Sequence, residues 1–177
     1  MLRFLIVTLA LLVTAPGSFA QGDHVYMGMK KCSMCHKGEV KGAIFEKWQG
    51  SQHAKAFTNL TDTAAAEVYK KLGKTGNPQQ DAACLKCHIT GAGADSAKAV
   101  ALIKDEGVTC EACHGAGADY GKMSVMKDKA AAVAAGMSAD PKATCIKCHN
   151  QESPTFKAFK FEEMWTKIAH AKPKAAG

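Results

Sequence analysis

The chain has 177 residues, a formal net charge of +7, and 47% hydrophobic but only 7% aromatic residues. This length allows one domain or at most two small ones. No stacking aromatic side chains are interleaved with the lysines, so the positive charge does not indicate nucleic-acid binding.

The first twenty residues have the order of a secretory signal. One positive charge precedes an apolar run of 12 residues, and a stretch of small residues follows. Such a run is shorter than the roughly 20 residues that a membrane-spanning helix needs. We therefore expect a signal peptide at 1–20, cleaved after Ala20, and one exported domain over 21–177 that does not span a membrane.

Short helices are expected along the mature chain, and no stretch has a reliable strand pattern. Val40, Ile44 and Trp48 are spaced four apart, as on one face of a helix. Periodicity, caps and terminal glycines indicate four further helices, at 63–72, 96–105, 124–135 and 161–170. Asp140 before Pro141 predicts the start of one more helix, which carries the last cysteine motif.

The eight cysteines form four C-x-x-C-H units with none left over: CSMCH (32–36), CLKCH (84–88), CEACH (110–114) and CIKCH (145–149). This is the c-type haem attachment signature, in which two thiols bond to the haem and the adjacent histidine binds the iron. Disulfides or zinc sites would not require a histidine after every second cysteine. A thioredoxin-like redox pair occurs once, not four times. The motifs therefore predict four covalently attached haem c groups.

The expected attachment residues are Cys32, Cys35, Cys84, Cys87, Cys110, Cys113, Cys145 and Cys148, with His36, His88, His114 and His149 as iron ligands. About 157 mature residues then share four haems, and about 39 residues rarely build a core unaided. We therefore expect a mainly α-helical protein with short helices and loops wrapped around four closely packed haems. The glycine-rich stretches 90–95 and 115–119 lack the flanks of phosphate loops and are interpreted as tight backbone beside a porphyrin.

The histidine count limits how the irons are bound. Four irons have eight axial positions, but the chain has 7 histidines, of which four belong to the motifs. His24, His53 and His170 remain, so at most three irons can have two histidines from one chain. His53 alone would be interpreted as a core residue; beside four haems it is expected to be a distal ligand.

The order of motifs resembles the tetrahaem cytochrome c-554 family. The matching pieces are Y-x-G-x-K-K-C-x-x-C-H, W-x-x-S-x-H-A-x-A, C-x-x-C-H-x-T-G, G-V-x-C-x-A-C-H-G and a last C-x-x-C-H before F-x-F-E-E-M. They extend from Tyr26 to His170, nearly the whole mature chain. The resemblance implies that His53 lies opposite His114 on the third haem. It also implies that His170 lies opposite His149 on the fourth haem.

The same resemblance implies a five-coordinate second haem on His88. In the family, a histidine about ten residues after the third motif binds the first haem, but here that stretch has none. Three arrangements fit. Met123 or Met126 binds the first iron and leaves His24 for the second; or His24 binds the first iron and the second stays open; or His24 reaches an iron in a neighbouring molecule. Packing roles for the methionines and a surface role for His24 are the simpler interpretations.

These features predict an exported electron-transfer protein rather than an enzyme, working between redox partners in the periplasm. The alternatives are reduction of a small nitrogen oxide at an open iron, and a conductive extracellular or cell-surface filament joined through His24. Cleavage of the signal peptide removes Arg3, and the ionised haem propionates add negative charge. The net charge of the mature protein with its haems is then about +2. Lysines still cluster near the first motif and near the chain end, which suits docking to an acidic partner.

Overall fold

The computed structural model describes residues 24–171, and the expected signal peptide lies outside the described residues. Every regular element within this range is helical, and the range contains no strand. The α-helices are α1 (Met29–His36), α2 (Ile44–Gln49), α3 (Thr63–Lys71), α4 (Ala82–His88), α5 (Cys110–His114), α6 (Met123–Met126), α7 (Lys129–Ala134), α8 (Pro141–Cys145) and α9 (Phe161–Ile168). Short 3-10 turns lie at Glu39–Lys41, Thr58–Thr61, Pro78–Gln80 and Lys104–Glu106. The mainly α-helical fold class is confirmed.

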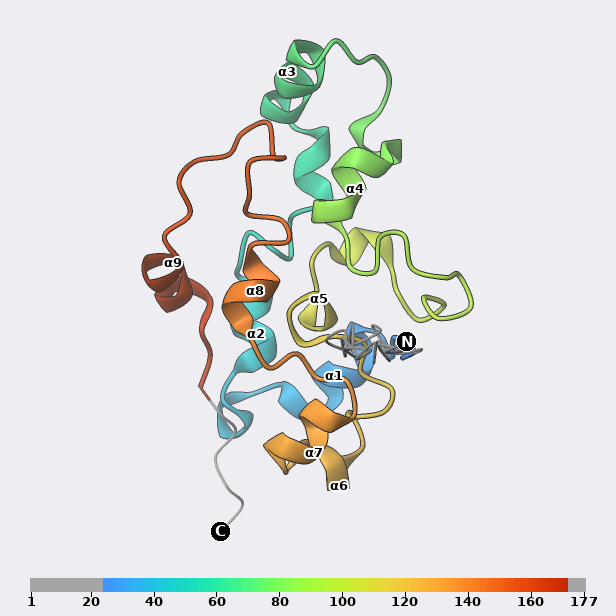
Figure 1. Ribbon diagram of the computed structural model, residues 1–177, viewed down its shortest axis with the longest axis vertical. Helices are drawn as coiled ribbons and strands as arrows, with labels where there is room; N and C mark the ends of the chain where they lie inside the picture. Colours follow the sequence, from blue (N-terminus) through green and yellow to red (C-terminus); the bar gives the residue numbers. More distant parts are fainter. Residues whose placement is uncertain (1–23, 172–177) are drawn as a thin grey trace, which may run out of the picture.

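The helices form an elongated arrangement with the motif helices along its length (Figure 1). α3 and α4 lie at one end, and α1, α6 and α7 lie at the other. α5 and α8 lie between these ends and contact each other, while α1 contacts both α2 and α5. Helices that carry different cysteine motifs therefore meet in the middle of the molecule.

Local signals placed several helix ends correctly. α3 begins after Asp62, whose side chain accepts a 2.7 Å hydrogen bond from the N–H of Ala65, and it ends just before Gly73. Asp140 caps α8 in the same way, through the N–H of Ala143 at 3.0 Å. The final helix, α9, stops at Ile168, two residues before the expected end at His170.

Two of the predicted helices do not form as continuous helices. Residues 96–105 make turns and one 3-10 segment, because the carbonyl of Lys98 accepts the N–H of Tyr26 at 2.9 Å instead of continuing a helix. Residues 124–135 divide into α6 and α7 at Asp128. Its side chain accepts hydrogen bonds from the N–H groups of Ala130 and Ala131, which starts a new helix there.

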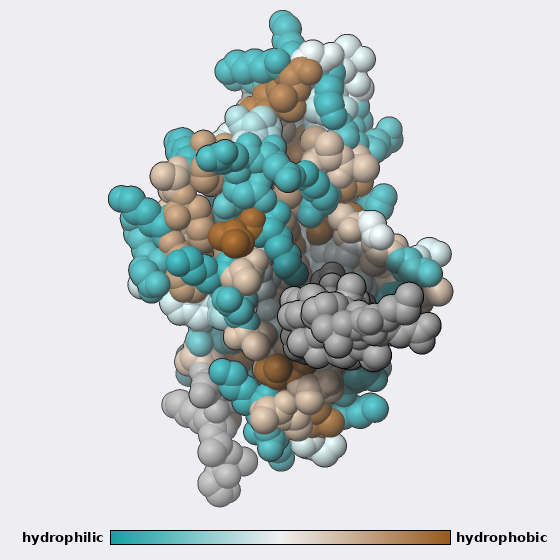
Figure 2. Space-filling view, viewed as in Figure 1, coloured by the Kyte–Doolittle hydropathy of each residue, from teal (hydrophilic) through white to brown (hydrophobic). Residues whose placement is uncertain are grey.

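Few apolar side chains bury one another. In residues 24–171 the buried hydrophobic side chains are Ala56, Leu60, Leu85 and Ala132. Larger ones are exposed, including Met34 at 66%, Val40 at 70% and Ile103 at 58%. Figure 2 shows a mostly hydrophilic face with separate hydrophobic patches near α3 and near α6 and α7. In the part that the structure describes, no helix has the length and hydropathy to cross a bilayer.

Candidate haem-binding sites

Each cysteine motif is presented by a short helix or by the turn after one. The first three motifs end α1, α4 and α5, so their cysteines, three residues apart, share a helix face and the histidine follows at the helix end. The fourth motif begins at the end of α8 and continues as a turn in which the N–H of His149 donates to the carbonyl of Cys145 at 2.9 Å. All eight cysteines are free thiols, so disulfides do not form this framework.

Thiols of different motifs lie beside one another. The Cys32 thiol of the first motif donates to the carbonyl of Gly28 at 3.7 Å. The neighbouring Cys110 thiol of the third motif is the largest cause of the raised pKa of Cys32. Partial burial, followed by the neighbouring Cys145, raises the pKa of the Cys113 thiol to about 11, which brings the third motif next to the fourth.

The fourth motif also adjoins the second. Burial, followed by the nearby Cys87, raises the pKa of the Cys148 thiol to about 12. The Cys148 sulfur also contacts the carbonyl oxygen of Lys86 at 4.0 Å. The spatial order of the four motifs is therefore first, third, fourth, second, which differs from their order along the chain.

His53 is fixed by backbone contacts from the segment that precedes the third motif. Its carbonyl oxygen accepts the N–H of Val108 at 3.0 Å, and the Trp48 indole N–H donates to the Val108 carbonyl at 2.8 Å. The ring of His53 has its centre 6.0 Å from the ring of His149. Burial, then the nearby His149, lowers the pKa of His53, so its imidazole is neutral at pH 7 and able to bind a metal.

His170 approaches a different motif. Its ring centre lies 5.9 Å from the ring of His114. Two imidazoles that bind opposite sides of one metal, each about 2 Å from it, have ring centres about 6 Å apart. Both observed pairs have that spacing. They are His53 with His149 and His170 with His114, which differs from the pairing that the family resemblance implied.

The other motif histidines are oriented by their ring nitrogens or by stacking. His88 Nδ1 lies 2.6 Å from the carbonyl oxygen of Ala56. A carbonyl can only accept, so Nδ1 carries the proton and Nε2 keeps the free lone pair that a metal needs. His149 stacks on Phe159 with ring centres 4.7 Å apart. His36 Nδ1 is buried without a hydrogen-bond partner.

His24 and the two candidate methionines are held elsewhere. His24 Nδ1 lies 2.7 Å from Asp119 Oδ2, and its ring packs so closely on Gly136 that a Cβ there would lie 2.6 Å from His24 Nε2. Met123 and Met126 are on α6, with side chains 63% and 37% exposed. A ligand role for these three residues stays a prediction.

Two polar residues next to the motifs were missed in the sequence. Thr109 is 2% exposed, and its hydroxyl lies 2.8 Å from that of Thr90, joining the start of the third motif to the end of the second. Glu111, between the third pair of cysteines, is also 2% exposed. The sequence did contain one signal for Glu111, because a charged residue stands inside a short cysteine motif. No feature of the sequence pointed to Thr90 or Thr109.

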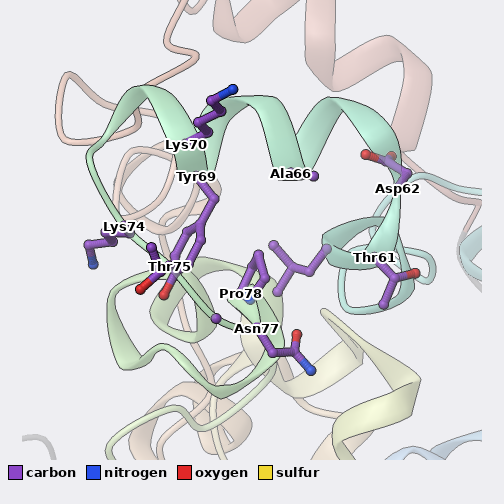
Figure 3. A pocket seen from close by; sticks show the side chains of 11 residues that line it. Thr61, Asp62, Ala66, Tyr69, Lys70, Lys74, Thr75, Asn77 and Pro78 are labelled. Carbon is purple, nitrogen blue, oxygen red and sulfur yellow. The ribbon is translucent and has the colours of Figure 1, made fainter.

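A surface pocket near α3 lies beside the second motif (Figure 3). Tyr69 and Pro78 line it, and the ammonium groups of Lys70 and Lys74 point away from its centre. The Lys74 ammonium instead lies 2.5 Å from Asp81, which also accepts the Tyr69 hydroxyl at 3.0 Å. This cluster supports the start of α4, because Asp81 caps that helix through the N–H of Ala83.

The side chains fit large apolar prosthetic groups. A chain of this length that packed only on itself would bury far more than four apolar side chains. The part of the chain that the structure describes instead leaves large apolar side chains such as Met34 and Val40 exposed. No three His, Cys, Asp or Glu side chains within residues 24–171 gather in a way that could hold a bare metal ion.

Comparison with known proteins supports the same cofactor. A family model described as "Cytochrome c554 and c-prime" matches residues 31–115, which include the first three motifs. Cytochrome c-554 of Nitrosomonas europaea is 32% identical over 119 residues, covering 65% of this chain. The chain spans about half of that relative, 48%.

A solved structure gives a consistent result over a longer part of the chain. The reduced state of cytochrome c554 from Nitrosomonas europaea matches with a TM-score of 0.54 and 25% identity, covering 82% of this chain and 79% of that chain. Cytochromes of this type carry covalently attached haem c, as the paired thiols here require. The chain is therefore similar, in sequence and in fold, to the cytochrome c554 family of multihaem c-type cytochromes.

Proposed function

We propose that this chain is an exported tetrahaem electron carrier that works between redox partners in the periplasm. The observation that carries the proposal is the contact between successive motifs, first to third to fourth to second. Each bound haem supplies an iron that takes up and releases one electron. The chain's own part is to attach the haems in a continuous row, set their ligands and shield them from water.

The four pairs of motif cysteines attach the haems, and the motif histidines are the proximal ligands. His53 is the distal ligand of the haem on His149, and His170 that of the haem on His114, because their ring spacings of 6.0 and 5.9 Å suit one metal between each pair. Bis-histidine ligation favours low potentials. The first and second haems take their sixth ligand, if any, from His24, Met123 or Met126.

Docking depends on lysines around the first motif. Five exposed lysines lie on and around α1 and α2: Lys30, Lys31, Lys37, Lys41 and Lys47. They suit an acidic redox partner, whose association would slow as salt screens the charges. His24 pairs with Asp119 of its own chain, which supports a discrete carrier over a filament joined through His24.

The test is the haem content and electron capacity of the purified protein. Intact mass should show four haems, and a spectroelectrochemical titration should take up four electrons reversibly. A protein with fewer haems, or with a haem that cannot be reoxidised, contradicts the proposal.

A second candidate function follows from the surroundings of His88. The two ring pairs use His53 and His170 on the third and fourth motifs, and His88 contacts the backbone of Ala56. An open second iron would bind a small molecule such as nitric oxide. Low-temperature EPR of the oxidised protein distinguishes the candidates: one high-spin haem in four supports binding there, and four low-spin haems remove that site.

A further inference from the structure

Glu111 forms a junction between the first and third motifs. Its carboxylate accepts hydrogen bonds from the backbone N–H groups of Met27 at 2.9 Å, Gly28 at 2.8 Å and Gly117 at 2.7 Å. Met27 and Gly28 directly precede α1, and Gly117 follows α5. One side chain therefore ties together three segments that meet around Cys32 and Cys110.

The surroundings of this carboxylate are closely packed. A Cβ at Gly117 would lie 3.0 Å from Glu111 Oε1 and 2.9 Å from the Met27 sulfur, so a side chain there would have to displace Met27 or Glu111. Burying a carboxylate costs free energy unless hydrogen bonds replace its water. The three N–H groups provide those bonds but carry no net charge, so they stabilise the negative charge without cancelling it.

We propose that Glu111 is a positioning residue that fixes the first motif against the third and places a buried negative charge beside the haems attached there, making both harder to reduce. The inference rests on the proposed function, because it requires haem on those two motifs. Reduction adds an electron to an iron, and a fixed negative charge nearby opposes that addition. Glu111 would then set part of the potential difference along the row of haems.

The reach of this charge is visible in neighbouring groups. Burial is the largest cause of the raised pKa values of Tyr26 and Tyr120, and the charge of Glu111 is the second. That charge also contributes to the raised pKa of Cys32, after the neighbouring Cys110 thiol and burial. Its influence therefore extends to attachment residues of both motifs.

The decisive variant is Glu111→Gln, which keeps the size of the side chain and removes its charge. The amide oxygen can still accept two of the N–H groups, while the amide NH₂ opposes the third. Potentiometric titration should show the midpoints of two of the four haems shifted upward and the other two unchanged. Glu67→Gln is the matched control, since it removes an exposed carboxylate on α3 at the far end of the molecule and should shift none.

A charge-preserving variant separates electrostatics from positioning. Glu111→Asp keeps the charge but is too short to reach all three donors. It should leave the midpoints close to those of the unmodified protein while amide hydrogen exchange at Met27, Gly28 and Gly117 becomes faster. In the unmodified protein these three amides should exchange as slowly as helical ones. Fast exchange there overturns the positioning role even if Glu111→Gln fails to fold.

Haem content distinguishes failure of this inference from failure of the proposed function. If the unmodified protein lacks haem on the first or third motif, both are overturned. If it carries four haems and Glu111→Gln shifts no midpoint, only the electrostatic role of Glu111 is overturned.

Discussion

The start of the helix that carries the second motif is held by its neighbours in sequence, although its end also contacts Ala56 and Cys148. The first and third motifs are held mainly by distant residues. Around α4, Asp81 pairs with Tyr69 and Lys74, at most 12 residues away. Around α1 and α5, Glu111 reaches Met27 across 84 positions, and Asp119 reaches His24 across 95. In Figure 1, α3 and α4 lie at one end of the molecule, α5 lies near its middle and α1 lies towards the other end.

One small chain therefore positions its cofactor motifs in two ways, by contacts between residues close in sequence and by contacts between residues far apart in sequence. Local support needs only a short stretch of chain to come together, so the start of α4 depends little on the rest of the fold. Distant support requires the N-terminal segment and the third motif to meet first, which costs loop-closure entropy. We therefore expect damage to remain local at the α3 and α4 end and to affect haems of several motifs at the other end.

The largest expected effect comes from removing a ligand at the long-range end. His170→Ala should convert one low-spin haem in four to high-spin, because His170 faces His114 at 5.9 Å. Low-temperature EPR of the oxidised protein measures the conversion. His170→Met should keep that haem low-spin and raise its potential. Lys167→Ala on α9 is the control. An unchanged spectrum in His170→Ala would show that another group faces His114.

A glycine pair tests how tightly the segment before the third motif is held. Gly107 (φ +67°) packs against the carbonyl of His53, where a Cβ would lie 2.8 Å from the oxygen. Gly73 has nearly the same backbone angle, φ +69°, with nothing within 4 Å of an added Cβ. Gly107→Ala should lower the free energy of unfolding by about 3 kcal/mol and Gly73→Ala by about 1 kcal/mol. Thermal unfolding measures both, and equal losses would contradict the packing described for Gly107.

The smallest effect is expected at a local cap. Asp62→Ala removes the hydrogen bond to the N–H of Ala65 and should cost about 1 kcal/mol. All four haem signals should keep their spin states and midpoints, because α3 carries no motif. Asp105→Ala, an exposed change outside the caps, should leave the unfolding midpoint where it is. A changed haem potential in Asp62→Ala would show that the two ends are more strongly coupled than the contacts indicate.

The same division explains what the sequence could predict. The extent of α3 and the start of α8 depend on a cap and a terminator within a few residues, and both were predictable. The haem motifs are pentapeptides, so they could also be recognised directly in the sequence. The failed helix at 96–105 depends on Tyr26, about 70 positions earlier, which takes the carbonyl of Lys98. No local pattern contains that contact.

The partners of the candidate ligands could not be predicted for a related reason. His53 and His170 were recognisable as candidates because the motifs consumed the other histidines except His24. Which motif each one faces depends on how α5, α8 and the C-terminal segment pack, and the family resemblance supplied the opposite pairing. Spacing along the chain gives the identity of the candidates but not their partners.

The spatial order of the motifs has a consequence for how the protein matures. The fourth motif lies between the third and the second, although it is made last. A chain that ends before Cys145 would hold three haems in two groups, one joining the first and third motifs and the other containing the second alone. The second and third motifs would then touch through Thr90 and Thr109, without the haem of the fourth motif between them. We therefore expect a truncated product to be coloured and haem-loaded but to pass electrons to the second haem more slowly.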